Sequence, residues 1–332
     1  MTAAVEFILL AGFLGSGKTS LLVDWLALPE AADTAVIVNE AGEIDVDGAI
    51  IAEGGTLPLS MMSNGCVCCS LTNDLVFTVR ALLEDRAKAG LPPFRRIILE
   101  GSGLVRPGPV LRSLSPLAPL GLRVRVVTAC DATRMGALLD EFDEVAAQLA
   151  AAGTLVLTKL DLALPGPAEA LAASVNPLAL RVVEADRAAR ARAAFGPAPP
   201  VDLPEPPAAP AAHPHMSVLR ATFSADATWE DKLDWMENLA AFCGDRLLRV
   251  KGFVRQPGVA GGMLLIQAVG TLFSPPVAMS GSRPEGLVVI LRDLGAAELR
   301  SMDPGAPVRI SVYRAGDGLA CQPGDSEASL TS

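Results

Sequence analysis

Aromatic residues make up only 4% of the 332-residue chain, and Tyr occurs once. A core must therefore be built mainly from Ala, Leu and Val, and a hydrophobic fraction of 51% is enough for a sizeable one. No run approaches the roughly 20 apolar residues that a membrane-spanning helix needs. The apolar start has no basic region, which argues against a signal peptide. We therefore expect a cytoplasmic protein that contacts no membrane.

Basic residues are also scarce, since 27 Lys and Arg face 37 Asp and Glu, for a formal net charge of -10. An acidic surface disfavours nucleic-acid backbones and anionic lipids, so neither is an expected partner, whereas a cationic ligand stays compatible. The length exceeds the roughly 250–300 residues at which single cores stop growing, which predicts two domains.

Short apolar runs alternate with helical patterns in residues 1–192, which predicts an α/β domain with a mostly parallel sheet flanked by helices. Pro and Ala dominate residues 193–215, as in a stiff linker. Strand-like runs around one helical pattern at 229–243 predict a smaller α+β domain at 216–315. Residues 316–332 are expected to form a disordered tail. The first-domain runs expected as strands are 7–10, 35–38, 96–99, 124–127 and 154–157.

The first predicted strand leads into Gly12-Phe-Leu-Gly-Ser-Gly-Lys-Thr19, which fits the phosphate-loop pattern G-x-x-x-x-G-K-[ST]. Backbone N–H groups and a helix N-terminus would bind the phosphates, Lys18 would reach the β- and γ-phosphates, and the Thr19 hydroxyl would ligate Mg²⁺. The alternative is a glycine-rich turn before a helix. The residues predicted to bind the nucleotide here are Gly12, Gly15, Ser16, Gly17, Lys18, Thr19 and Ser20.

Glu100 ends an apolar run and would supply the carboxylate that phosphoryl transfer needs beside Mg²⁺, in addition to the Thr19 hydroxyl. Gly103, three residues on, could present its N–H to the γ-phosphate. The alternative is an ordinary strand end followed by a turn. Lys18, Thr19 and Glu100 are therefore the predicted catalytic residues.

Thr158-Lys159-Leu-Asp161 looks like the guanine-reading motif Asn-Lys-x-Asp with Thr in the first place. Asp161 could accept hydrogen bonds from guanine N1 and N2, and Lys159 would lie along the base plane. A carboxylate left unpaired by the wrong base gives strong discrimination. Thr158 leaves the usual contact to purine N7 open, and a plain polar turn is the alternative.

Cys66, Cys68 and Cys69 lie within four residues, a poor disulfide framework but a good source of soft ligands for Zn²⁺, Cu(I) or Co²⁺. Three thiolates leave a fourth position open, which suits a transferable metal. A redox pair, or cysteines that are merely packed, are the alternatives. The acidic segment 38–47 could be a γ-phosphate switch, could add Glu43 to the metal site, or could be a solvated loop.

The remaining cysteines and the histidines are expected to have no such role. Cys130 follows a predicted strand and Cys243 lies in a helical pattern, and both are predicted to be small buried hydrophobes. Cys321 lies in the tail. His213 and His215 flank a proline at the end of the linker, where we expect a solvated pair without a partner, although two imidazoles could assist metal capture.

Together these motifs resemble the CobW-type family of P-loop GTPases, which includes zinc chaperones, cobalamin-biosynthesis CobW proteins and nitrile hydratase activators. The resemblance implies a P-loop GTPase domain using GTP and Mg²⁺, a Zn²⁺ or Co²⁺ site at the cysteines, and a C-terminal domain that contacts client proteins. It also implies that nucleotide state changes metal affinity. The matching segments are Gly12–Thr19, Asn39-Glu-Ala-Gly-Glu43, Asn64-Gly-Cys-Val-Cys-Cys69, Glu100-Gly-Ser-Gly103, Thr158–Asp161, Asn176-Pro177 and Asp245–Gly252.

Three departures limit the transfer of family roles. Arg106 stands before Pro107 where the family has Asp, so a role of that carboxylate does not transfer. Ala41 replaces the common Phe, which weakens the switch analogy. The His-rich linker of many members is reduced to His213 and His215.

The leading hypothesis is a GTP-hydrolysing metallochaperone that delivers Zn²⁺ or Co²⁺ to an apo client protein. Its turnover is expected to be slow, because no arginine finger is evident. A dedicated activator of one metalloenzyme, and a metal-sensing module with incidental hydrolysis, are the alternatives. An ATP-dependent small-molecule kinase is a further one, against which Asp161 argues. Homo-oligomerisation, and with it a metal shared between chains, stays open.

Overall fold

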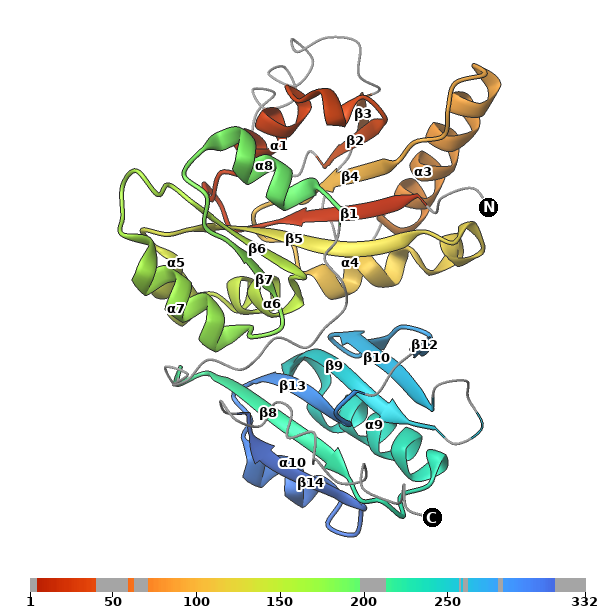
Figure 1. Ribbon diagram of the computed structural model, residues 1–332, viewed down its shortest axis with the longest axis vertical. Helices are drawn as coiled ribbons and strands as arrows, with labels where there is room; N and C mark the ends of the chain where they lie inside the picture. Colours follow the sequence, from red (N-terminus) through yellow and green to blue (C-terminus); the bar gives the residue numbers. More distant parts are fainter. Residues whose placement is uncertain are drawn as a thin grey trace, which may run out of the picture.

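The computed structural model describes residues 5–39, 59–62, 71–197, 213–256, 258, 262–279 and 283–313. These residues form two domains, each built on its own β-sheet, and Figure 1 shows the second domain lying against the helices of the first. Among the helices of this described part, none is long and apolar enough to cross a membrane.

The first domain contains a seven-stranded sheet with strand order β3-β2-β4-β1-β5-β6-β7, and every neighbouring pair is parallel. All six residues of the central strand β1 are buried, as expected for a strand with helices on both faces. The strands are β1 (Glu6–Ala11), β2 (Thr34–Asn39), β3 (Leu59–Met62), β4 (Arg96–Glu100), β5 (Arg123–Asp131), β6 (Thr154–Thr158) and β7 (Leu180–Val182).

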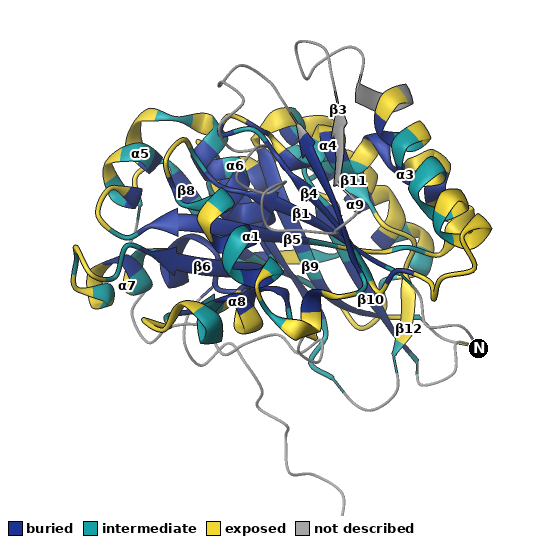
Figure 2. Ribbon diagram, turned by 90° about the horizontal axis from the view of Figure 1, so that it is seen from above, coloured by how far each residue is buried: buried dark blue, intermediate teal, exposed yellow. Residues whose placement is uncertain are grey.

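Side chains alternate along β1 between two hydrophobic layers. Ile8 and Leu10 pack with Trp25 and Phe195 under α1 and α8, whereas Phe7 and Leu9 pack under α3 and α4. Figure 2 shows this buried sheet between partly exposed helices. The helices are α1 (Lys18–Leu26), α3 (Leu71–Lys88), α4 (Pro107–Ser113), α5 (Met135–Glu141), α6 (Asp143–Ala151), α7 (Pro165–Val175) and α8 (Arg187–Phe195), with 3₁₀ turns at Pro29–Ala31 and Ser115–Leu120.

The first domain continues past residue 192, where the sequence predicted the linker to begin. Helix α8 runs to Phe195, which is fully buried with its ring centroid 5.7 Å from that of Trp25. Alanine content alone does not separate a linker from the last turn of a helix that packs on the sheet.

The second domain is an antiparallel sheet with order β11-β10-β9-β13-β8-β14, and β12 also pairs with β10. Helix α9 begins at a capping box formed by Thr228 and Asp231 and covers one face. Helix α10, which the sequence analysis did not predict, packs in the same core. The elements are β8 (Met216–Phe223), α9 (Trp229–Cys243), β9 (Leu247–Arg255), β10 (Met263–Val269), β11 (Leu272–Phe273), β12 (Val277–Met279), β13 (Gly286–Arg292), α10 (Ala296–Met302) and β14 (Val308–Val312), with a 3₁₀ turn at Gly244–Arg246.

The opposite face of the second sheet shares a hydrophobic core with helices α6 and α7 of the first domain. Leu248, Val288 and Ile290 are buried in that shared core. Arg249 on β9 is buried as well and donates from Nη1 to the Ala151 carbonyl at the end of α6, at 2.9 Å. Burial lowers the pKa of Arg249 to about 10, so the guanidinium stays charged at neutral pH. The two domains are therefore joined by packed side chains as well as by the chain.

The structure confirms one group of sequence predictions outside the site. Cys130 and Cys243 are buried, and burial raises the pKa of their thiols to about 12 and about 11. Both cysteines therefore behave as small hydrophobic residues at neutral pH.

The prediction for the two histidines is wrong, because both have carboxylate partners. His213 is nearly buried, with Nε2 3.0 Å from Asp140 Oδ1 on α5. His215 Nδ1 lies 2.7 Å from Asp293 Oδ1. His213 Nδ1 accepts the backbone N–H of His215, so the Nε2 atom carries the proton that Asp140 accepts. Each pair joins residues far apart in the chain, 78 positions for His215 and Asp293, so sequence spacing does not reveal it.

Candidate functional site

The carboxyl ends of four parallel strands meet at one edge of the first sheet. Strand β1 leads into the phosphate loop, β4 ends at Glu100, β5 at Asp131 and β6 at Thr158. The register pairs Leu10 with Glu100 and Asp131 with Thr158. Ligands of open α/β sheets bind at this edge, so the fold places three of the sequence-predicted motifs around one site.

The phosphate loop closes tightly in front of α1. Gly17 caps the helix at φ 88°, a left-handed conformation that favours glycine. A Cβ on Gly12 would lie 2.6 Å from the Ala129 carbonyl oxygen, so the loop requires glycine there too. Lys18 Nζ donates to the carbonyls of Gly12 and Phe13, at 2.9 and 3.3 Å. The ammonium group therefore lies across the loop.

Thr19 and Glu100 form a close pair beside this loop. The Thr19 hydroxyl donates to Glu100 Oε1 at 2.6 Å, and Glu100 is buried. Hydroxyl and carboxylate oxygens are the ligand types that Mg²⁺ takes at phosphate sites, so these residues fit that cation and would hold it. Bound there, Mg²⁺ would neutralise charge on the nucleotide phosphates.

Gly103 packs directly on the phosphate loop. A Cβ at Gly103 would lie 2.3 Å from Leu14 Cδ2 and 2.8 Å from the Leu14 nitrogen, so no larger residue fits without moving the loop. The buried Gln148 on α6 holds the segment in place by donating to the carbonyls of Gly103 and Val105, at 3.0 and 2.9 Å. Sequence analysis missed Gln148, since a lone Gln in a helical pattern carries no spacing signal.

Thr158, whose contact to purine N7 the sequence left open, contacts the phosphate loop. Its hydroxyl lies 2.7 Å from the Ser16 carbonyl and 3.1 Å from the Cys130 carbonyl, and the residue is buried. The hydroxyl has one proton, so it bonds one carbonyl at a time. Thr158 thereby ties β6 to the loop. Asp161 lies beyond it on the exposed rim of the same edge.

Asp131 at the end of β5 organises the neighbouring cations, and sequence analysis missed it. Its buried carboxylate accepts from Lys159 Nζ at 2.7 Å, from Arg134 Nε at 3.0 Å and from the backbone and hydroxyl of Thr133. Burial alone would raise the pKa of Asp131, but these hydrogen bonds outweigh it and lower the pKa to about 2. Lys159 of the predicted base-reading motif is thus held by a carboxylate 28 residues earlier in the chain.

The predicted thiolate site, Cys66, Cys68 and Cys69 with Glu43, lies outside the described residues. Within the described part, no group of three or more His, Cys, Asp or Glu side chains could hold a metal ion. The neighbouring strands are described. Met61 on β3, Val38 on β2 and Glu100 on β4 pair in one row across the sheet. Cys66 follows Met61 by five residues in the sequence.

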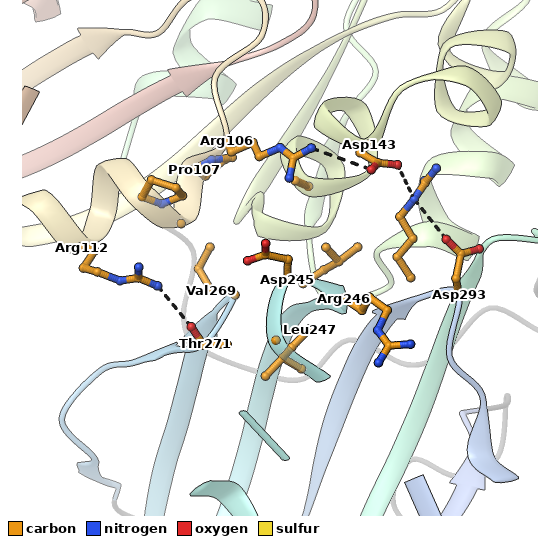
Figure 3. A pocket seen from close by; sticks show the side chains of 17 residues that line it. Arg106, Pro107, Arg112, Asp143, Asp245, Arg246, Leu247, Val269, Thr271 and Asp293 are labelled. Atoms are coloured by element: carbon orange, nitrogen blue, oxygen red, sulfur yellow. Dashed lines mark hydrogen bonds and ion pairs between the residues drawn. The ribbon is translucent and has the colours of Figure 1, made fainter. Parts of the chain in front are cut away.

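A second network of contacts links the segment after Gly103 to the second domain. Arg106 Nη2 lies 2.8 Å from Glu144 Oε1 and 3.8 Å from Asp143 Oδ2, both on α6. Asp143 also pairs with Arg292 of β13, at 2.7 Å. Figure 3 shows Arg106 and Asp143 lining a cleft between the domains, with Arg112 bound to Thr271 on its other side. The Arg that replaces the family's Asp therefore belongs to an ion-pair network at the domain interface.

The glycine-rich loop, the lysine across it and the hydroxyl–carboxylate pair beside it define a phosphate-loop nucleotide-binding domain of the α/β class. The chain belongs to the CobW/HypB/UreG family, whose nucleotide-binding domain model matches residues 6–181. Residues 216–302 match the C-terminal domain model of the cobalamin synthesis protein CobW. The family resemblance inferred from the motifs is therefore confirmed for both domains.

Curated relatives include two proteins of Escherichia coli strain K12. The zinc chaperone YjiA is 35% identical over 166 residues, covering 49% of this chain and 51% of YjiA. The zinc chaperone YeiR is 36% identical over 169 residues, covering 49% of each. The chain thus spans about half the length of the curated relatives it matches.

A solved structure extends the likeness to both domains. The Zn(II)-bound YjiA GTPase from Escherichia coli superposes with a TM-score of 0.65 at 23% identity, covering 92% of this chain and 99% of that one. At this identity the match establishes the fold. The predicted architecture, a P-loop domain followed by a smaller α+β domain, is confirmed.

Proposed function

We propose that the chain is a GTP-hydrolysing metallochaperone. The observation that carries the proposal is the Thr19 hydroxyl held 2.6 Å from Glu100 beside a loop crossed by Lys18. In the reaction, a water oxygen bonds to the γ-phosphorus and the bond to the β–γ bridging oxygen breaks, leaving its electron pair on GDP. The water proton ends on the released phosphate. Lys18 binds the β- and γ-phosphates, and Thr19 and Glu100 hold Mg²⁺.

Guanine selectivity is assigned to Asp161, with Lys159 along the base. The rim position of Asp161, two residues beyond the Asp131-bound Lys159, supports this assignment. Adenine lacks the N1 and N2 donors that a carboxylate accepts, so it would leave Asp161 unpaired. Thr158 supports the site indirectly through the Ser16 carbonyl.

The cargo is Zn²⁺ or Co²⁺, bound by Cys66, Cys68 and Cys69 with Glu43 as a further ligand. Thiolates are soft ligands that suit these ions. The names of the relatives support zinc, since YjiA and YeiR are both zinc chaperones. The client is an apo-metalloprotein, contacted by the C-terminal domain in the cytoplasm.

In this proposal, nucleotide state controls metal delivery through the contacts between the two domains. Gly103 lies on the phosphate loop, and Arg106, three residues later, pairs with Asp143 and Glu144 of α6. Asp143 in turn pairs with Arg292 of the second domain. A movement of the 100–106 segment with the γ-phosphate would therefore change ion pairs at the domain interface. Such coupling requires two states with different nucleotide affinities.

The test is competition for Zn²⁺ and Co²⁺ against a chromogenic chelator. It compares the apo protein, the Mg²⁺–GDP complex and a non-hydrolysable GTP-analogue complex with a Cys66→Ala/Cys68→Ala/Cys69→Ala control. We expect the GTP analogue to change affinity at least about tenfold, roughly 1.4 kcal/mol of coupling, and the control to lose binding. A metal affinity that is the same in all nucleotide states, or that survives loss of the thiols, would refute nucleotide-controlled binding of the cargo metal.

A further inference from the structure

Arg134 reaches the phosphate loop from the connection between β5 and α5. Its Nη2 donates to the Leu14 carbonyl at 3.1 Å, and its Nε donates to Asp131 at 3.0 Å. A Cβ on Gly15 would lie 3.2 Å from the same Nη2 atom. The guanidinium therefore lies against the loop at Leu14 and Gly15, within the segment that wraps the phosphates.

The contacts of Arg134 leave most of its hydrogen-bonding capacity available. A guanidinium has five N–H groups, and only two of those on Arg134 are used among the described residues. The side chain is 49% exposed. Its outer contact is a neutral carbonyl, which a charged phosphate oxygen can replace with a stronger, charge-assisted bond.

Asp131 anchors the inner end of this side chain. The carboxylate is 1% exposed and binds Nε, while Nη2 extends to the Leu14 carbonyl. The same carboxylate holds Lys159. One buried acid thus positions a cation for the base and a second cation next to the loop.

We propose that Arg134 is a catalytic arginine supplied by the chain itself. When GTP binds, the terminal nitrogens of Arg134 exchange the Leu14 carbonyl for oxygens of the γ-phosphoryl group and stabilise the charge that develops during its transfer. The inference rests on the proposed GTP hydrolysis, and it names an arginine finger where none was evident from the sequence. Arginines in this role contribute roughly 10³–10⁵ in kcat.

The other arginine near the loop is arranged differently. Arg106 directs its guanidinium to Glu144 and Asp143 on α6, toward the domain interface. Arg134, by contrast, donates from a terminal nitrogen to the phosphate loop. Of these two arginines, Arg134 is therefore the one placed to contact the triphosphate.

The experiment compares Arg134→Ala and Arg134→Lys with wild type in single-turnover hydrolysis of bound GTP. Arg192→Ala is the matched control, because Arg192 is 51% exposed and forms one surface ion pair with Glu30, away from the site. GDP affinity and thermal unfolding are measured for each variant. A further readout is the tightening of GDP binding by aluminium fluoride, which mimics the γ-phosphoryl group in the transition state of its transfer.

We expect Arg134→Ala to lower the hydrolysis rate at least about a hundredfold and to abolish the aluminium fluoride effect, with GDP affinity within about threefold of wild type. Arg134→Lys should recover little, since a lysine lacks the planar fork. A smaller loss of rate, or a parallel loss of GDP affinity, would show that Arg134 only braces the loop. If wild type binds GTP but does not hydrolyse it, the proposed hydrolysis itself fails and Arg134 fails with it.

Discussion

Replacing Asp131 with Asn tests the claim that one buried carboxylate organises the nucleotide site. The amide keeps the shape but loses the charge, and its NH₂ group would face the donors of Lys159, Arg134 or Thr133. Native contacts lower the pKa of Asp131 from 3.8 to about 2. Since one pKa unit corresponds to about 1.4 kcal/mol, the charge contributes roughly 2 kcal/mol to stability at pH 7.

The pH dependence of this contribution has a definite sign. A pKa that is lower in the folded state stabilises above the unfolded value of about 3.9 and loses its effect as pH falls towards the folded value. The free energy of unfolding of Asp131→Asn should therefore lie below that of wild type by a constant amount from pH 7 to about pH 4. The difference should shrink between about pH 4 and pH 2.

Urea unfolding of both proteins across this pH range, with Glu30→Gln as a control, measures the effect. Glu30 forms an exposed ion pair with Arg192, so its replacement should change stability little. GDP affinity should also fall in Asp131→Asn, because Lys159 loses its anchor. Equal stability at pH 7, or a difference that is the same at pH 3 and pH 7, would refute the assigned role.

Three further outcomes follow from single contacts. Gly103→Ala should weaken GTP-analogue binding by at least about tenfold, as measured by calorimetry. The new methyl group overlaps Leu14, and overpacking costs about 1–3 kcal/mol. An affinity equal to that of wild type would show that the phosphate loop moves to accommodate the methyl group. Thr158→Val should lower the free energy of unfolding by about 1 kcal/mol through loss of the bond to the Ser16 carbonyl, and an unchanged urea midpoint would contradict that bond. The Cys130 thiol, with a pKa raised to about 12 by burial, should resist iodoacetamide at pH 8 until the protein unfolds, as mass spectrometry of its peptide would record; rapid native labelling would contradict its burial.

The sequence predicted the layout of the fold well, because the signals for it are local. Continuous apolar runs marked β1 and β4, and the amphipathic pattern at 229–243 matches α9 at both ends. The phosphate loop was equally readable, since its glycines and its Lys-Thr pair have meaning at fixed spacing. Helix α10 was missed because its seven residues are too few to show a helical periodicity that would distinguish it from a loop.

The part of the site that sequence reasoning missed depends on contacts between distant residues. Asp131 and Lys159 are 28 positions apart, and Gln148 reaches Gly103 across 45. Neither Asp131 nor Gln148 lies in a sequence motif. The same reason explains the contact of the Thr158 hydroxyl with the phosphate loop, because the parallel pairing of β5 and β6 brings Thr158 there.

Arg106 shows how a departure from a family pattern can be informative. The sequence showed only that a carboxylate had become a cation before Pro107. In the structure that cation pairs with Glu144 and, more distantly, with Asp143, which itself binds Arg292 of the second domain. An Asp at position 106 would face these two carboxylates, and like charges at such distances repel. The acidic start of α6 therefore favours a cation at position 106, and this chain joins the segment after Gly103 to the domain interface by ion pairs.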